Sequence, residues 1–115
     1  MGYYSDVAIQ IEGSKEQLSK QMEVIETFAC EPDEIKQNDE AILLLWNNIK
    51  WYEQSFDEIR AIVEWFDDLD AGKDIDSKQF IRIGEDYDDT EYINDGEINN
   101  YIGIERTFDL GEFNE

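Results

Sequence analysis

The chain of 115 residues carries 30 acidic and 9 basic side chains and no histidine, so its formal net charge is −21 at pH 7. Direct binding to nucleic acids or to membrane surfaces is disfavoured because both are anionic, and the absence of histidine excludes Ser-His and Cys-His catalytic pairs. With 41% hydrophobic and 13% aromatic residues, the chain differs from a disordered acidic tail, which has too few apolar residues to fold.

The first third of the chain predicts a strand, a helix and a loop. Residues 7–11 follow the alternating pattern of a strand. Ser14 and Gln17 match a capping box, and apolar residues then recur every three or four positions, which predicts a helix over residues 15–29. Pro32 is expected to stop this helix and to open a polar acidic loop over residues 31–40.

The middle of the chain predicts a buried strand and a second helix. Residues 41–46 form a short, continuous apolar run, which is typical of a strand buried on both faces; a helix is the alternative, because Leu and Ala favour it. Residues 49–52 are expected to extend the strand after a bend or bulge. Ser55 and Glu58 match a second capping box, and the apolar stripe that follows predicts a helix over residues 56–71, with Gly72 as its C-terminal cap.

The last third of the chain predicts strands at residues 80–83, 91–93 and 101–106, with a hairpin turn at Asn94-Asp95-Gly96. Together these elements predict one acidic α+β domain over residues 1–115. It has about four to five strands in one mixed or antiparallel sheet, two helices on one face, and the order β-α-β-α-β-β-β.

Two features of the sequence bear on the cellular location. The apolar runs are too short to span a membrane, and the N-terminus lacks the basic and apolar segments of a signal peptide. We therefore expect a cytoplasmic protein with no membrane contact.

The single cysteine, Cys30, excludes an internal disulfide. Its position near the end of an apolar stripe predicts a buried thiol.

The acidic residues concentrate in residues 51–115, which hold 20 of the 30. Same-face carboxylates on a strand are roughly 6.6 Å apart, similar to the spacing of phosphates along one DNA strand. We predict that a partner binds two acidic clusters and Trp65, a partly exposed aromatic anchor. The first cluster is Asp67, Asp68, Asp70, Asp74 and Asp76, and the second is Glu85, Asp86, Asp88, Asp89 and Glu91.

The sequence contains no complete motif for binding calcium or phosphate. Asp95-Gly96-Glu97-Ile98 matches the centre of an EF-hand loop, but Ile93 and Ile102 occupy positions that need oxygen ligands. No Gly-rich phosphate loop is present, and pairs of carboxylates arise by chance among 30 acidic residues. The sequence therefore predicts a protein that is not an enzyme and has no cofactor and no metal site. A fold that depends on a bound cation is an alternative.

The remaining aromatic and basic residues have two interpretations. Trp46, Trp51 and Tyr52 cluster around Lys50 in the sequence. We expect these aromatic rings in the core, with the lysine stem lying across an aromatic face; a partner-binding patch is the alternative. The two arginines of the acidic region, Arg82 and Arg106, are expected to pair with neighbouring carboxylates.

Three short motifs resemble a group of small acidic proteins encoded by phages and prophages: Gly2-Tyr3-Tyr4-Ser5-Asp6-Val7, Ile49-Lys50-Trp51-Tyr52 and Arg82-Ile83-Gly84-Glu85-Asp86. The resemblance implies a phage context and carries over no catalytic residue. Phages use acidic DNA mimics against restriction enzymes and CRISPR effectors, and this chain is similar to such mimics in charge and size.

These observations lead to two hypotheses about function. The first is a non-enzymatic inhibitor, acting in the infected bacterial host, whose acidic surface blocks a basic nucleic-acid-binding defence protein such as a CRISPR effector or a restriction enzyme. The second is a phage accessory module whose acidic surface serves solubility and whose aromatic patch binds a partner.

Overall fold

Five strands form an antiparallel sheet around a buried central strand, β1 (Ser5–Glu12). In this computed structural model, which describes residues 3–86, 89–96, 103–104 and 108–109, β1 pairs with β3 (Ala41–Ile49) on one side and with β4 (Ser77–Gly84) on the other. The edge strands are β2 (Glu34–Gln37) and β5 (Thr90–Asp95), so the strand order is β2-β3-β1-β4-β5.

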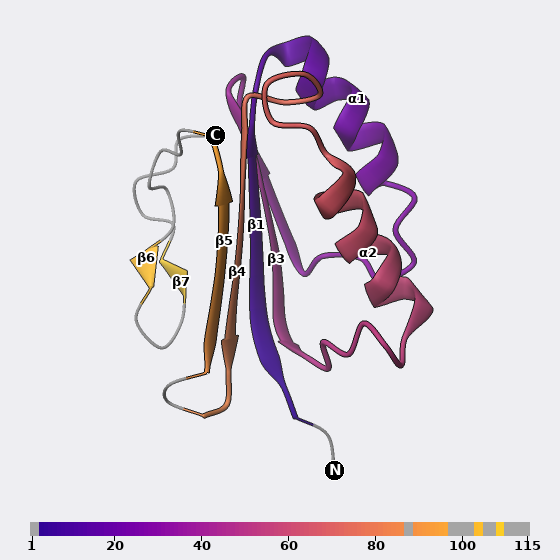
Figure 1. Ribbon diagram of the computed structural model, residues 1–115, viewed down its shortest axis with the longest axis vertical. Helices are drawn as coiled ribbons and strands as arrows, with labels where there is room; N and C mark the ends of the chain where they lie inside the picture. Colours follow the sequence, from indigo (N-terminus) through magenta and orange to yellow (C-terminus); the bar gives the residue numbers. More distant parts are fainter. Residues whose placement is uncertain (1–2, 87–88, 97–102, 105–107, 110–115) are drawn as a thin grey trace.

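Both helices, α1 (Lys15–Ile25) and α2 (Asp57–Asp68), cover the same face of this sheet (Figure 1). The short pair β6 (Gly103–Ile104) and β7 (Phe108–Asp109) lies on the opposite side of the sheet in this view. The predicted α+β class, with an antiparallel sheet of five strands and two helices on one face, is confirmed, but β6 and β7 form a separate two-stranded sheet rather than part of it. Within the described residues, neither helix is long and apolar enough to cross a membrane.

The buried core follows the strand and helix patterns of apolar residues in the sequence. Residues of odd number in β1 face the helices and join the stripe of α2 in one buried cluster, which includes Val7, Ile9, Ile11, Ile62, Phe66 and Leu69. The even-numbered Ala8 lies on the other face with a second cluster, formed by Ala41, Leu43, Leu45, Ile81 and Ile83. The run at residues 41–46 is therefore buried on both faces, as expected for its continuous apolar sequence.

The helix boundaries differ from the predicted ones. The capping box of Ser14 and Gln17 is confirmed, but α1 ends at Ile25 rather than at residue 29. The predicted capping box at Ser55 is wrong: the N-terminal cap of α2 is Phe56, which makes no side-chain capping bond. The helix also ends at Asp68, with Leu69 as its cap, whereas Gly72 has φ +108° in the following turn.

Two further segments differ from the sequence analysis. Residues 31–40, predicted as a loop, contain the edge strand β2. Its side chains are mostly exposed and carry no apolar pattern, so the strand is formed by its backbone pairing with β3. The strand β3 continues through Asn47 and Asn48 to Ile49, with a register shift against β1. Residues 97–102 lie outside the described part, and so does most of the predicted strand 101–106; its described residues form β6, which pairs with β7.

Candidate functional site

The first acidic cluster lies at the end of α2 and in the loop that leads to β4. All five members are exposed, and none forms an ion pair within the described residues: Asp67, Asp68, Asp70, Asp74 and Asp76. The backbone amides of Lys73 and Asp74 donate to the carbonyl of Asp70, and the Asp74 carboxylate accepts from the Asp70 amide at 3.0 Å. Asp70 and Asp74 therefore belong to a hydrogen-bonded turn that follows the helix.

Two of these carboxylates occupy a position that is unfavourable for the helix. Asp67 and Asp68 lie in the last turn of α2, which contains no basic residue. The negative end of the helix dipole disfavours each of them by about 0.3–1 kcal/mol. Lys78 of β4 offsets part of this cost, because its buried ammonium donates to the carbonyls of Phe66 at 2.6 Å and Asp67 at 3.3 Å. This role of Lys78 could not be predicted from the sequence, because a strand pattern does not show which groups a lysine side chain faces.

The second acidic cluster lies at the other end of β4. Nine residue steps of extended chain separate Asp76 from Glu85, which is roughly 30 Å at ~3.3 Å per residue. The two ends of β4, which lead to the two clusters, therefore lie at opposite ends of the sheet (Figure 1). Glu85 and Asp86 are exposed, whereas Asp88 lies outside the described residues, as does Arg106.

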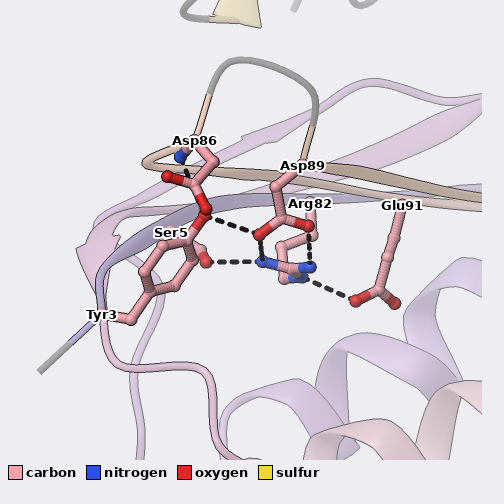
Figure 2. A network of polar contacts seen from close by, with 6 residues as sticks. All are labelled: Tyr3, Ser5, Arg82, Asp86, Asp89 and Glu91. Atoms are coloured by element: carbon pink, nitrogen blue, oxygen red, sulfur yellow. Dashed lines mark hydrogen bonds and ion pairs between the residues drawn. The ribbon is translucent and has the colours of Figure 1, made fainter.

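Arg82 neutralises the carboxylates at the start of β5 (Figure 2). Its guanidinium donates to both carboxylate oxygens of Asp89, at 3.1 and 2.7 Å, and to Glu91 Oε1 at 2.8 Å. A further bond from Nη1 reaches Ser5 Oγ at 2.9 Å. The prediction that Arg82 pairs with neighbouring carboxylates is confirmed. Asp89 and Glu91 are therefore less available to a partner than the exposed acidic residues beyond α2.

Tyr3 connects the N-terminal segment to this network, which the sequence analysis did not foresee. Its hydroxyl donates to Asp89 Oδ2 at 2.7 Å and accepts from the Asp86 amide at 2.9 Å (Figure 2). The amide of Tyr4 donates to Glu85 Oε1 at 2.9 Å. Part of the second cluster thus holds the N-terminal segment against the loop between β4 and β5.

The bonds from Arg82, and next those from Tyr3, lower the pKa of Asp89 below its ordinary value of 3.8. A carboxylate with a depressed folded-state pKa stabilises the fold above the unfolded-state value, and this contribution is lost as the pH falls through the folded-state pKa. We expect Asp89→Asn to lower the free energy of unfolding by about 1–2 kcal/mol at pH 6. The difference from the wild type should be smaller at pH 3 than at pH 6, because pH 3 lies below the ordinary pKa of 3.8. Urea unfolding of both proteins at the two pH values measures it.

The control for this measurement is Asp86→Asn, which removes an exposed carboxylate of the same loop and should change the stability little at either pH. A difference for Asp89→Asn that stayed constant from pH 6 to pH 3 would contradict a charge-dependent role for this carboxylate.

A cleft of about 230 Å³ lies between α2 and the edge strand β5. It is lined by the apolar residues Ile9, Trp51, Val63, Phe66, Phe80 and Ile93 and by the acidic residues Glu53, Asp67 and Glu91. Ile93 lies directly opposite Phe80 and remains 45% exposed at the edge of the sheet. The cleft brings together one acidic residue from each predicted cluster, Asp67 and Glu91. It adds Glu53, which the sequence analysis did not single out.

The tryptophans contribute mainly to packing. Trp46 is buried, its indole N–H donates to the Cys30 carbonyl at 3.1 Å, and its ring lies 5.5 Å from that of Trp51. Trp65 is half-buried: its N–H donates to Gln21 at 2.9 Å, and its ring is in a T-shaped arrangement with that of Phe28, 5.2 Å between centroids. The contact of Trp65 with Gln21 links the two helices. Of the three, Trp51 alone lines the cleft.

Cys30 is half-buried rather than buried. Partial burial, and then the nearby charges of Glu58 and Asp33, raise the pKa of its thiol. A thiol with a raised pKa is mostly protonated at neutral pH and is a poor nucleophile. Cys30 therefore has the properties of a packing residue.

The described residues contain no group of three His, Cys, Asp or Glu side chains that could hold a metal ion. The cleft has an apolar lining and three carboxylates, an arrangement that favours cationic groups over anionic ones. Comparisons of this chain with models of protein families, with curated proteins and with solved structures give no match.

Proposed function

We propose that this protein is a non-enzymatic, phage-encoded inhibitor that binds a basic, nucleic-acid-binding defence protein of the bacterial host by mimicking the charge of DNA. The phage context of the proposal rests on the sequence resemblance. The acidic surface carries the binding, and its centre is the cluster beyond α2, because those carboxylates are exposed and unpaired within the described residues.

The observation that carries the proposal is the retention of carboxylates where they destabilise the fold. A net charge of −21 weakens the compact state by self-repulsion, and Asp67 and Asp68 also oppose the dipole of α2. Solubility requires a net charge of only about 2–8 in a small domain. A charge this far beyond that range is consistent with selection for binding to a basic surface.

The dimensions of the molecule suit a groove built for DNA. Its longest extent is 42 Å, the length of roughly 12 base pairs at ~3.4 Å per pair. The backbone turn that carries Asp70 and Asp74 is held by hydrogen bonds, so little backbone conformational entropy is lost there on binding. Electrostatic attraction of this kind raises the association rate and is weakened by salt.

The experiment is a pull-down from bacterial lysate in about 50 and 200 mM NaCl, with duplex DNA as competitor and the captured protein identified. We expect a nucleic-acid-binding protein whose capture falls roughly tenfold or more between the two salt concentrations. DNA should displace it. The triple variant Asp68→Lys, Asp70→Lys, Asp76→Lys should weaken binding of the purified partner by roughly tenfold or more.

The matched control is Glu16→Lys, Glu23→Lys, Glu26→Lys, which changes the net charge equally on exposed positions of α1 and at its C-terminal cap. It should weaken binding by less than about threefold. Equal losses in the two variants would contradict a binding surface centred beyond α2.

The second candidate, a protein-interaction module, is favoured by the exposed apolar side chains of β5, Tyr92 at 50% and Ile93 at 45% exposure. A captured partner that resists salt and ignores DNA would support this module and contradict charge mimicry.

A further inference from the structure

The cleft between α2 and β5 combines an aromatic interior with an acidic rim. The rings of Trp51 and Phe66 both pack against the ring of Phe80, at centroid-to-centroid distances of 6.0 and 5.9 Å. Phe66 and Phe80 are buried, whereas Trp51 and Val63 are half-buried and form the transition to the surface. At the rim, Glu53 and Asp67 are exposed and form no ion pair within the described residues.

Charge decides which ligands this cleft admits. An anion is repelled by Glu53, Asp67 and Glu91, and a neutral apolar group would remove these carboxylates from water without compensation. A cation with an apolar stem satisfies both parts of the lining, because aromatic faces attract cations and carboxylates accept their hydrogen bonds. The volume of about 230 Å³ is smaller than a drug-sized pocket and suits a single side chain.

The basic groups nearest the cleft already have partners. Lys78 Nζ lies 4.7 Å from the centroid of the Phe66 ring and donates to two backbone carbonyls, and Arg82 is bound to Asp89 and Glu91. The fold therefore already pairs a cation with one of the rings that line the cleft. Glu53 and Asp67 remain for a cation from outside.

We propose that this cleft binds an arginine side chain presented by the basic partner. The planar guanidinium stacks on aromatic rings and binds a carboxylate through two parallel bonds, which the ammonium of lysine does not do. The inference rests on the proposed function for the identity of the partner, but the cleft can be tested without that partner. It assigns to Trp51, Glu53 and Asp67 a direct role in recognition.

The test is an NMR titration of the full chain with N-acetyl-arginine amide, followed by the indole N–H signal of Trp51. Arginine should give saturable shifts at millimolar concentration, while the Trp65 signal stays unchanged as an internal control. N-acetyl-citrulline amide, which has the same shape without the charge, should bind at least tenfold more weakly. Equal affinity for the two probes, or for the lysine analogue and arginine, would overturn the proposal.

Two kinds of variant locate the binding. Val63→Phe fills the cleft and should reduce the affinity for the probe at least tenfold. If this variant fails to fold, Ile93→Trp on the exposed edge strand replaces it, with the same expected loss. Glu53→Gln with Asp67→Asn should reduce it about fivefold or more, whereas Glu16→Gln with Glu23→Gln should change it less than twofold. Unchanged affinity in the filled variants would refute the cleft as the site.

These results are separable from those of the proposed function. Loss of arginine binding with an intact, salt-sensitive pull-down would reject the cleft and keep the acidic surface. Arginine binding without a captured partner would keep the cleft and reject the inhibitor.

Discussion

Replacing Trp46 with alanine is expected to lower the free energy of unfolding by about 3–5 kcal/mol and the midpoint of thermal unfolding by roughly 12–20 °C. Trp46 is only 1% exposed, and its ring packs against Trp51 within the cluster between the sheet and the helices. Its removal leaves a cavity and leaves the Cys30 carbonyl without its donor. Because small domains are stable by only about 5–15 kcal/mol, this loss is a large fraction of the total stability.

Urea unfolding of the wild type and the variant measures this loss. Trp46→Phe keeps most of the buried volume but removes the indole N–H, so it should cost far less, about 1–2 kcal/mol. A loss below about 1 kcal/mol for Trp46→Ala would contradict the placement of this side chain at the centre of the core.

Replacing Arg82 with methionine is expected to lower the free energy of unfolding by about 2–3 kcal/mol. The guanidinium makes four hydrogen bonds to Ser5, Asp89 and Glu91 and is 13% exposed. Without it, two carboxylates repel each other and lose their charge-assisted bonds. The carboxylates are themselves 33% and 56% exposed, so water screens part of this repulsion and the loss stays below that of a fully buried pair.

Arg60→Met is the matched control for Arg82→Met. It changes the net charge by the same amount, but Arg60 and its partner Asp57 lie on the exposed surface of α2, with side chains 50% and 88% exposed. We expect a loss of no more than about 0.5 kcal/mol. Similar losses in the two variants in urea unfolding would show that net charge, rather than the network around Arg82, is responsible.

The Arg82 network bears on the proposed function. The acidic residues that contact Arg82 stabilise the fold, whereas those at the end of α2 and in the following loop form the proposed binding surface. Asp89 and Glu91 hold Arg82, and Asp89 also holds the N-terminal segment through its bond with Tyr3. Asp68, Asp70 and Asp76 have no such structural role among the described residues, so a charge change there tests binding with little effect on stability.

The sequence alone determined the class of the fold and most of its core. Of the predicted stripe of α2, Val63 is half-buried and the other members, Ile59, Ile62, Phe66 and Leu69, are buried. The run at residues 41–46 is also buried as predicted. The spacing of apolar residues reflects directly which face of a helix or strand is covered. Local capping chemistry was less reliable. Ser14 and Gln17 form a capping box, whereas the same pattern at Ser55 does not, because α2 begins two residues later at Asp57, with Phe56 as its cap.

Composition also determined the net charge, but only the tertiary structure decided how that charge is used. The strand β2 exists through its hydrogen bonds with β3, which its own side chains do not indicate. The network of Tyr3, Arg82 and Asp89 and the cleft of Trp51, Asp67 and Glu91 join residues far apart in the chain. The energy of a charge depends on its distance to other charges and on its exposure to water. The folded chain sets both quantities, and no local pattern contains them.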